Sequence, residues 1–281
     1  MKKSVFIILS VLLCFCCCLS IKPVFVSASA TTNQEKSNMP KKEFTKPKAS
    51  LLAIVIDDFG GWERTGVKEL LESDIPITCA IMPFVDNSQQ DYIDAIKNGK
   101  EVILHMPMQA NVSLPTNWYG TVYIENNESK ESAIQKLQKC LDTMPEAKGF
   151  NIHIGSGACQ NVELMQHLYE YADKHNMFFL DSRTINADKC EEACQAAKSI
   201  YLGRDVFLEP NDNRSHYGVT QRISQGVALA KEKGYAIVIG HVGAEGGLNT
   251  ARAILDYKDK FESEGVKVVP LSQIYQEIKN Q

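Results

Sequence analysis

The sequence predicts an α/β fold in which seven or eight β/α units form a barrel or a variant of one. From residue 51 onward, short apolar runs rich in β-branched residues alternate with loops and with segments of helical period. Several runs are apolar at every position, which is typical of parallel strands covered on both faces. No break of domain size interrupts the alternation, so we expect a single domain. A doubly wound open sheet is the alternative architecture.

Eight apolar runs are the expected strands, and the amphipathic segments between them are the expected helices. The strands are expected at residues 52–56, 77–82, 102–104, 149–152, 177–180, 200–202, 236–239 and 266–269. Two apolar stripes have helical spacing, namely Ile134, Leu137, Leu141 and Met144, and Val219, Ile223, Val227 and Ala230. Asn98-Gly99 and Lys233-Gly234 are typical helix ends and stand just before expected strands.

The composition of the 281 residues is that of a globular protein. It has 44% hydrophobic and 23% charged residues with 17 Gly and 10 Pro, which excludes collagen-like and low-complexity chains. The net charge is −4, and without the three lysines of residues 1–30 it is −7, from 27 basic and 34 acidic residues. A mildly acidic body disfavours nucleic acid as a partner.

The first 49 residues are expected to direct the chain and not to fold with the body. Lys2 and Lys3 precede an apolar run over residues 5–19, and Ala28-Ser29-Ala30 follows, as in a secretory signal peptide. We therefore expect a signal peptide at 1–30, a flexible polar linker at 31–49 and the folded domain at 50–281. A retained membrane anchor is the alternative, although the run is shorter than the ~20 residues that cross a bilayer. Either reading gives a secreted or extracytoplasmic protein.

Five cysteines lie outside the predicted signal peptide: Cys79, Cys140, Cys159, Cys190 and Cys194. An odd number in about 250 residues is not a disulfide scaffold. Cys79 and Cys140 occupy apolar positions of a strand and a helix, so we expect them in the core. Cys190 and Cys194 have i, i+4 spacing, which leaves a local bridge in an oxidising compartment as an open alternative.

Side chains that bind metals or move protons follow several expected strands. Parallel strands of a barrel carry their active site at the carboxyl ends, so these side chains are expected to meet. They are Asp57 and Asp58, His105, His153, Asp181 with Arg183, Arg204 and His241. Any one of the histidines alone suggests an ordinary packed residue, but three beside an aspartate pair favour a functional site.

Two imidazoles and one carboxylate suit a mononuclear divalent-metal site with room for water and substrate. A second carboxylate takes the proton of the attacking water, and an acid protonates the leaving group. Asp57 and Asp58 divide these roles only if the strand bends, because neighbouring strand residues point to opposite faces. Residues 59–61, Phe-Gly-Gly, permit that bend, and a plain turn is the alternative reading of the segment.

Signals for other chemistries are weak. The sequence has no G-x-x-x-x-G-K-[ST], G-x-S-x-G or H-E-x-x-H. The glycine-rich residues 240–247 allow a phosphate-binding loop and with it a metal-assisted phosphoester hydrolase as a minor alternative. Trp62, Trp118, Tyr119 and Tyr123 lie in or near the expected site loops, where they serve either sugar stacking or packing.

Six ordered motifs between residues 50 and 278 resemble the divergent polysaccharide deacetylase family, a distant branch of the NodB-like carbohydrate esterases. They are Ala53-Ile54-Val55-Ile56-Asp57-Asp58, Leu104-His105-Met106-Pro107-Met108, Asn151-x-His153-x-Gly155-Ser156, Phe179-Leu180-Asp181-Ser182-Arg183-Thr184, Arg204-Asp205-Val206-Phe207-Leu208 and Ile239-Gly240-His241. The resemblance implies a distorted (β/α) barrel and a metal-dependent deacetylase.

Carried onto this chain, the resemblance implies that Asp57 is the base and Asp58, His105 and His153 are metal ligands. His241 then matches a late-strand histidine that acts as acid. Two departures stand out. The wider superfamily takes both histidines from one H-x-x-x-H motif, whereas Gln109 stands four residues after His105. Ile152 stands where the branch usually has a second asparagine.

We therefore expect an exported hydrolase that binds zinc or a similar ion and deacetylates an envelope polysaccharide or peptidoglycan sugar. Asp181 is expected to orient His241, and Arg183 or Arg204 to hold Asp57 or a substrate carboxylate. A non-catalytic glycan-binding or scaffold module that keeps the deacetylase pocket is the alternative. The membrane is expected as a partner only through an uncleaved leader, and the sequence leaves the oligomeric state open.

Overall fold

The structure is a computed structural model that describes residues 50–186, 188–210 and 213–281. The expected signal peptide and linker, residues 1–30 and 31–49, lie outside these described residues. Within the described residues, no helix is both long and apolar enough to span a bilayer.

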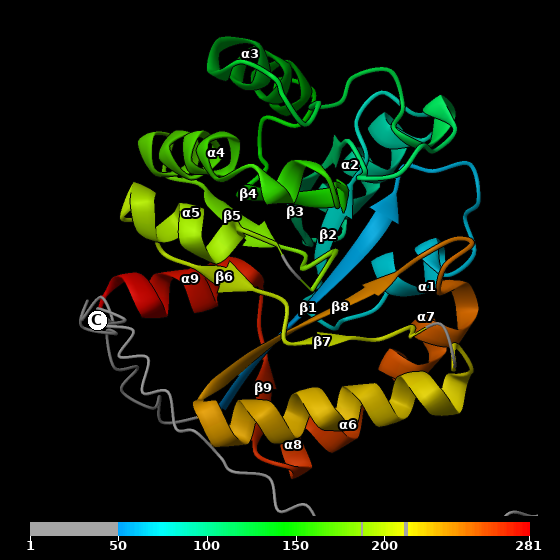
Figure 1. The fold of residues 1–281 in the computed structure, drawn as a ribbon. Coiled ribbons are helices and arrows are strands. Elements are labelled where there is room, and N and C mark those ends of the chain that lie inside the picture. The colour runs from blue at the N-terminus through cyan, green and yellow to red at the C-terminus, as the bar shows by residue number, and fades with distance from the viewer. Residues whose placement is uncertain (1–49, 187, 211–212) are drawn as a thin grey trace, which may run out of the picture. The chain divides into compact units, whose positions relative to one another are not determined.

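A parallel sheet organises the molecule, and helices pack around it (Figure 1). Its strands run in the order β6-β5-β4-β3-β2-β1-β8-β7, with β9 paired to β1. The bounds are β1 (Ser50–Phe59), β2 (Thr78–Ile81), β3 (Glu101–Met108), β4 (Gly149–Ile154), β5 (Phe178–Asp181), β6 (Leu202–Gly203), β7 (Val206–Phe207), β8 (Tyr235–His241) and β9 (Val266–Val268).

The strand order is that of a barrel with one open seam. Chain neighbours are sheet neighbours from β1 to β6, and β8 returns to the other side of β1. A doubly wound sheet would instead reverse its order at an inner strand. The described residues contain no ladder between β6 and β7, so the sheet is curled but not closed. The predicted distorted barrel is confirmed, and the open-sheet alternative is not.

Two details of the sheet differ from the expectation. The strand β7, Val206–Phe207, was not expected, because two residues are too few to give a hydrophobic pattern. In addition, β1, β3 and β4 extend past the polar residues thought to follow them, so Asp57, His105 and His153 lie within strands. Ladder hydrogen bonds use the backbone, so a polar side chain does not end a strand.

The helices cover the sheet much as the apolar stripes predict. Val219, Ile223, Val227 and Ala230 are buried on α6, which ends at Gly234 in a left-handed conformation with φ 97°. The bounds are α1 (Val67–Leu71), α2 (Ser88–Lys97), α3 (Lys130–Leu141), α4 (Val162–Lys174), α5 (Cys190–Ala197), α6 (His216–Lys233), α7 (Gly247–Asp256), α8 (Lys258–Ser263) and α9 (Leu271–Lys279), with short 3-10 turns η1 (Thr116–Trp118) and η2 (Ala158–Gln160).

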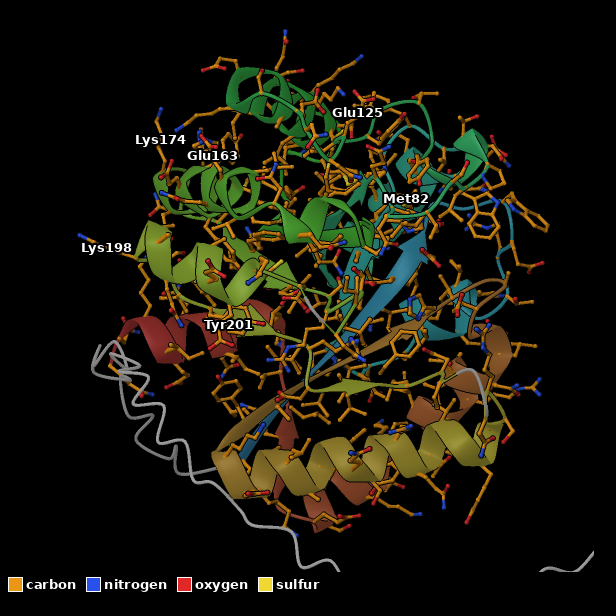
Figure 2. The ribbon with its side chains drawn as sticks, in the orientation of Figure 1. Met82, Glu125, Glu163, Lys174, Lys198 and Tyr201 are labelled. Carbon is orange, nitrogen blue, oxygen red and sulfur yellow. The ribbon has the colours of Figure 1, made fainter. Side chains whose placement is uncertain are left out.

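Alternate residues of β1 enter two separate clusters of the core, because successive strand residues point to opposite faces. Ile54 and Ile56 belong to the large cluster between sheet and helices, whereas Ala53 and Val55 belong to a smaller one that α9 joins through Leu271. Side chains fill the space between sheet and helices in Figure 2, where the labelled Lys174 and Lys198 lie at the outer edge. The buried sheet is therefore a rigid base for the strand ends.

Removing core volume at Ile54 should destabilise the fold. Ile54 is fully buried, so Ile54→Ala should lower the free energy of unfolding by about 2–5 kcal/mol, measured by urea denaturation. The matched control is Ile93→Ala on α2, where the side chain is 49% exposed. Equal losses for the two variants would contradict the assignment of the core.

Candidate metal centre

The aspartate pair reaches one site because β1 is irregular at that point. The register between β1 and β2 shifts between Ile56 and Phe59, and Asp58 has a left-handed φ of 68°. Asp57 Oδ2 and Asp58 Oδ1 consequently lie 3.8 and 3.3 Å from the same atom, Nε2 of His105. The expected bend is present, but it lies at Asp58 itself and not only in the Phe-Gly-Gly segment that follows.

The two histidines come from neighbouring strands. In the β3–β4 ladder His105 lies opposite Asn151, and Pro107 lies opposite His153. The imidazole rings meet edge to face, with centroids 4.8 Å apart and an interplanar angle of 73°. The structure therefore brings together a pair that no local sequence motif joins.

A chain of hydrogen bonds fixes which nitrogen of His105 faces the site. The Asp57 carboxylate accepts a hydrogen bond from Asn151 Nδ2 at 2.8 Å, which turns the amide oxygen of Asn151 toward His105 Nδ1 at 2.7 Å. That oxygen only accepts, so Nδ1 of His105 carries hydrogen and donates. The Nε2 atom of His105 is left to face the aspartates.

In His153 the other ring nitrogen faces the site. Its Nε2 lies 3.0 Å from the carbonyl oxygen of Trp118, which only accepts hydrogen bonds. Nε2 of His153 therefore carries hydrogen, and Nδ1 faces the site. A histidine that coordinates a metal usually donates its other ring N–H to such a carbonyl or amide partner.

Three donor atoms form a nearly equilateral triangle. His105 Nε2 and His153 Nδ1 are 3.0 Å apart, and Asp58 Oδ1 lies 3.3 and 3.2 Å from them. Ligands about 2.0–2.1 Å from a tetrahedral ion are separated by roughly 3.3 Å, so the triangle fits one face of a zinc site. Asp58, His105 and His153 could thus hold one divalent cation, with the remaining coordination left to water or substrate.

The charges of this cluster are strongly coupled. Burial raises the pKa of Asp57, against the lowering effect of His105 and His241. Burial opposes ionisation of Asp58 too, but the neighbouring rings of His105 and His153 hold the pKa of that carboxyl well below its usual range. The pKa of His105 is raised despite its burial, because both aspartates favour its charged form. A positive charge is thus stabilised at this point of the molecule.

His241 stands beside the aspartates on the next strand. It pairs with Asp57 in the β1–β8 ladder, and its Nε2 lies 4.0 Å from Asp57 Oδ2. Its Nδ1 lies 3.0 Å from Glu209 Oε2. Burial disfavours the charged ring, but the hydrogen bond and the charge of Glu209, together with the aspartates, raise the pKa of His241 to about 10. His241 is therefore protonated at neutral pH.

Glu209 was not singled out in the sequence, although a signal was present. It follows the apolar residues 206–208 directly, as the other site residues follow their strands. Its side chain is fully buried and accepts hydrogen bonds from Thr250 and from the backbone N–H and ring of His241. Glu209 thus takes the orienting place that we expected Asp181 to fill.

Asp181, Arg183 and Arg204 lie together, and within the described residues no hydrogen bond or ion pair joins them to Asp57 or His241, although the charge of Asp57 acts on Arg204. Asp181 accepts hydrogen bonds from the hydroxyl of Tyr201 at 2.6 Å and from the backbone of Arg183 at 2.8 Å. Arg183 donates to the carbonyl of Arg204, and Arg204 donates to the carbonyls of Ser182 and Arg183. The two guanidinium groups therefore bind backbone oxygens here.

The residues that depart from the family pattern have structural roles. Gln109 lies just after β3, where its carbonyl accepts hydrogen bonds from Gly157 and Ala158 at 3.1 Å and its side chain accepts one from Asn126. Ile152 is buried in the large core cluster. Neither residue replaces a donor of the triangle.

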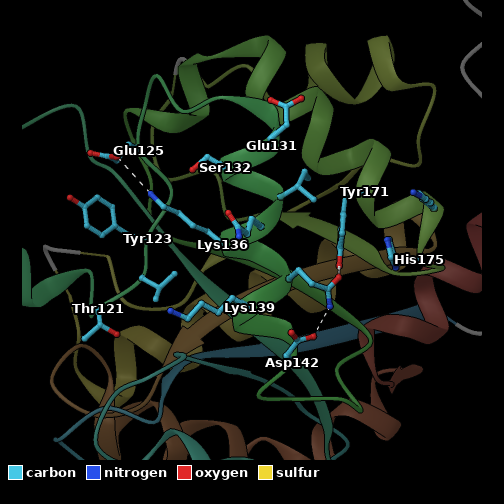
Figure 3. A pocket seen from close by; sticks show the side chains of 15 residues that line it. Thr121, Tyr123, Glu125, Glu131, Ser132, Lys136, Lys139, Asp142, Tyr171 and His175 are labelled. Carbon is cyan, nitrogen blue, oxygen red and sulfur yellow. Dashed lines mark hydrogen bonds and ion pairs between the residues drawn. The ribbon is translucent and has the colours of Figure 1, made fainter.

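Among the described residues, neither the cavity nor the backbone of the glycine-rich segment contributes a donor to the triangle. A cavity of about 1000 Å³ is lined by residues of α3, of α4 and of the 121–125 loop (Figure 3), and no donor of the triangle lines it. A Cβ on Gly246 would lie 2.6 Å from Glu209 Oε1, so that glycine is needed for close packing. Trp62 and Trp118 are 78% and 55% exposed, whereas Tyr119 is buried and stacks on Tyr123.

Comparisons of sequence find one family model and two curated relatives. The model of a family described as divergent polysaccharide deacetylase matches residues 54–275. Uncharacterized protein YibQ of Escherichia coli is 30% identical over 193 residues, which are 69% of this chain and 59% of that protein. An uncharacterized protein of Haemophilus influenzae is 28% identical over 192 residues, which are 68% of this chain and 66% of that one. The match thus spans less than two thirds of either relative.

Comparisons of structure support the fold. Uncharacterized protein ATU2773 of Agrobacterium tumefaciens matches with a TM-score of 0.70 at 17% identity, covering 81% of this chain and 90% of that one. BA3943, a CE4 family pseudoenzyme of Bacillus anthracis, gives 0.53 at 15% identity, covering 81% and 66%. The Bc1960 peptidoglycan N-acetylglucosamine deacetylase gives 0.53 at 12% identity, covering 83% and 92%.

Binding of Zn²⁺ at the triangle should weaken as the pH falls, because the cation and protons compete for the same ring nitrogens. The pKa of His105 is raised above its ordinary 6.5, so the competition starts at a higher pH than for a free histidine. We expect the affinity at pH 6 to be at least about tenfold lower than at pH 8, measured against a zinc-binding dye.

Two variants separate this site from adventitious binding. His105→Ala should weaken binding by about 100-fold or more, whereas His175→Ala, at the end of α4, should leave it unchanged. Equal affinities for His105→Ala and the unaltered chain would show that the cation binds elsewhere.

Proposed function

The chain belongs to the divergent polysaccharide deacetylase family, and we propose that it is an exported, metal-dependent hydrolase that removes acetyl groups from an envelope polysaccharide or a peptidoglycan sugar. The observation that carries the proposal is the donor triangle with a further carboxylate beside it. The proposal assigns a cation site, a base and an acid to this one group of side chains, which their short distances support. These are the parts that metal-assisted amide or ester hydrolysis needs.

Asp58, His105 and His153 are proposed to hold the metal, with zinc as the ion that the donor set fits. When bound, such an ion lowers the pKa of a bound water and polarises the substrate carbonyl. Asn151 and the carbonyl of Trp118 keep the two rings turned toward the ion. The site is therefore shaped before the cation arrives.

Asp57 is proposed as the base. Its Oδ1 accepts from Asn151, so Oδ2 remains to take the proton of the attacking water. Burial raises the pKa of Asp57, which makes the carboxylate a stronger base than an exposed aspartate. Its position next to the triangle, and not within it, suits a group that moves a proton while Asp58 holds the ion.

His241 is proposed as the acid that protonates the leaving nitrogen or oxygen. It is charged at neutral pH, and Glu209 holds the ring through Nδ1. Its Nε2 lies 4.0 Å from Asp57 Oδ2, so acid and base flank one small space. After the reaction, proton transfer from Asp57 toward His241 would restore both groups.

Arg183 and Arg204 are proposed only to attract a substrate carboxylate, since their guanidinium groups donate to backbone carbonyls and not to Asp57. The guanidinium of Arg204 lies 5.0 Å from the centre of the Phe207 ring, and that ring packs edge to face on His241 at 5.1 Å. The charge of Arg204 is therefore separated from the proposed acid, His241, by the ring of Phe207. Asp181 supports this arrangement through Arg183 and Tyr201.

A non-catalytic glycan-binding module is the second candidate. It is favoured by the departure at Gln109 and by the fold likeness to a protein described as a CE4 family pseudoenzyme. It is disfavoured by the joint presence of Asp57 and a protonated His241 beside an intact donor triangle.

Replacing the base distinguishes these candidates. Asp57→Asn should lower kcat for release of acetate from an acetylated glycan by about 10²–10⁴-fold, because proton abstraction is lost. Zinc content should persist, since Asp57 is outside the triangle. Asp259→Asn on exposed α8 is the matched control. Undiminished acetate release by Asp57→Asn would reject Asp57 as base, and no release by the unaltered chain on any acetylated glycan would favour the binding module.

The alkaline limit of activity should depend on Glu209. Glu209 raises the pKa of His241 through its hydrogen bond and its charge, so His241 should lose its proton, and kcat/KM should fall, only on the alkaline side of neutrality. Glu209→Gln removes the charge that raises this pKa, and its alkaline limb should move to lower pH by at least about one unit. Profiles of kcat/KM against pH for the two proteins test this, with circular dichroism to verify folding. Superimposable alkaline limbs would show that Glu209 has no role through His241.

A further inference from the structure

We propose that Cys159 and Cys190 form a disulfide bond when the chain folds in the presence of a disulfide-bearing oxidant. Cys159 lies in η2, just beyond the β4 turn that follows His153, and Cys190 begins α5. Both residues are fully buried, and the proposed hydrolysis uses neither of them. The inference is independent of the proposed function.

The backbone holds these two cysteines next to each other. The N–H of Lys189 donates to the carbonyl oxygen of Cys159 at 2.7 Å, so the start of α5 lies directly on η2. Cys159 has the largest influence on the Cys190 thiol, whose pKa it raises, and Thr184 Oγ1 lies 3.8 Å from Cys159 Sγ. Because the residue before Cys190 is hydrogen-bonded to Cys159 itself, the two cysteines need little backbone movement to reach disulfide geometry.

The pair suggested by sequence spacing is disfavoured on physical grounds. Cys190 and Cys194 occupy one helix, where Cβ atoms at i and i+4 are about 5–6 Å apart. A disulfide needs Cβ atoms about 3.5–4.5 Å apart, so this bridge would require α5 to distort. Cys194 instead lies beside Ser199, whose backbone N–H donates to the carbonyl oxygen of Cys194 at 3.1 Å.

The reaction is an ordinary thiol–disulfide exchange. One cysteine thiolate attacks a sulfur of the oxidant, releases one thiol of the oxidant and forms a mixed disulfide. The second cysteine thiolate then attacks the cysteine sulfur of the mixed disulfide and releases the other thiol of the oxidant. The two cysteine thiols lose two protons and two electrons, and the oxidant disulfide becomes two thiols. The contact with Cys159 and burial raise the pKa of Cys190 well above its usual range, so exchange is slow once α5 is packed. The bond should therefore form during folding.

The bond would close the loop over residues 159–190, which contains β5 and the Asp181–Arg183 turn. It would tie α5 to η2, whose neighbours Gly157 and Ala158 already donate hydrogen bonds to the carbonyl of Gln109. The segment that follows His153 would then be held both by the disulfide bond to α5 and by the hydrogen bonds to Gln109. Closing a loop of this length stabilises a folded chain chiefly by restricting the unfolded one.

The test is refolding of the whole chain in a buffer of oxidised and reduced glutathione. To keep the N-terminal cysteines out of the exchange, four are replaced by serine, namely Cys14, Cys16, Cys17 and Cys18. Free thiols are then alkylated, and the digest is examined by mass spectrometry. We expect a cross-linked peptide that joins residues 159 and 190 and is two hydrogens lighter than the reduced pair. The midpoint of thermal unfolding should rise by roughly 5–10 °C relative to reduced protein.

Single serine variants provide the control. Cys194→Ser should keep both the cross-link and the stabilisation, whereas Cys190→Ser should lose both. Folded protein in which Cys159 and Cys190 are both alkylated would overturn the proposal. A cross-link between residues 190 and 194 would overturn it as well.

Discussion

The amide of Asn151 joins the parts of the site on which the functional account depends. It donates to Asp57 and accepts from His105, so one buried side chain sets both the free oxygen of the proposed base and the free nitrogen of a proposed ligand. Because Asn151 lies opposite His105 in the β3–β4 ladder, the sheet register fixes this link. A slip of one residue would turn every side chain of β4 to the other face and would dismantle the triangle.

The positions of the two aspartates depend on a strained backbone conformation at one residue of β1. Asp58 adopts a left-handed backbone within β1, a conformation that costs free energy for a residue other than glycine. The shift places two adjacent carboxylates on one side, so that one faces two imidazoles and the other faces His241. Core packing of β1 on both faces stabilises the strand against this cost. The buried Glu209, two residues past the end of β7, then holds His241 protonated, which keeps an acid and a base side by side.

The sequence predicts the longer strands and helices of this molecule. It does not predict the short strand β7 or which side chains become partners in the fold. Apolar runs locate most of the sheet, and polar residues after them locate Asp57, Asp58, His105, His153 and His241. The two-residue strand β7 has no periodicity to detect, and Glu209 was overlooked with it. Spacing along the chain suggested Cys190 with Cys194, whereas packing brings Cys190 to Cys159, 31 residues away in the chain. Asp181 carries the same strand-end signal as the site residues, yet it holds Tyr201 and Arg183, because a strand end does not specify which neighbour a side chain will meet.

The claim that one cation bridges Asp58, His105 and His153 is tested most directly by anomalous X-ray diffraction at the zinc edge from crystals grown with zinc. The account predicts one strong peak about 2.0–2.3 Å from three protein atoms. They are a carboxylate oxygen of Asp58, Nε2 of His105 and Nδ1 of His153. A peak bound through the other nitrogen of either histidine, or zinc located only elsewhere in the molecule, would contradict it.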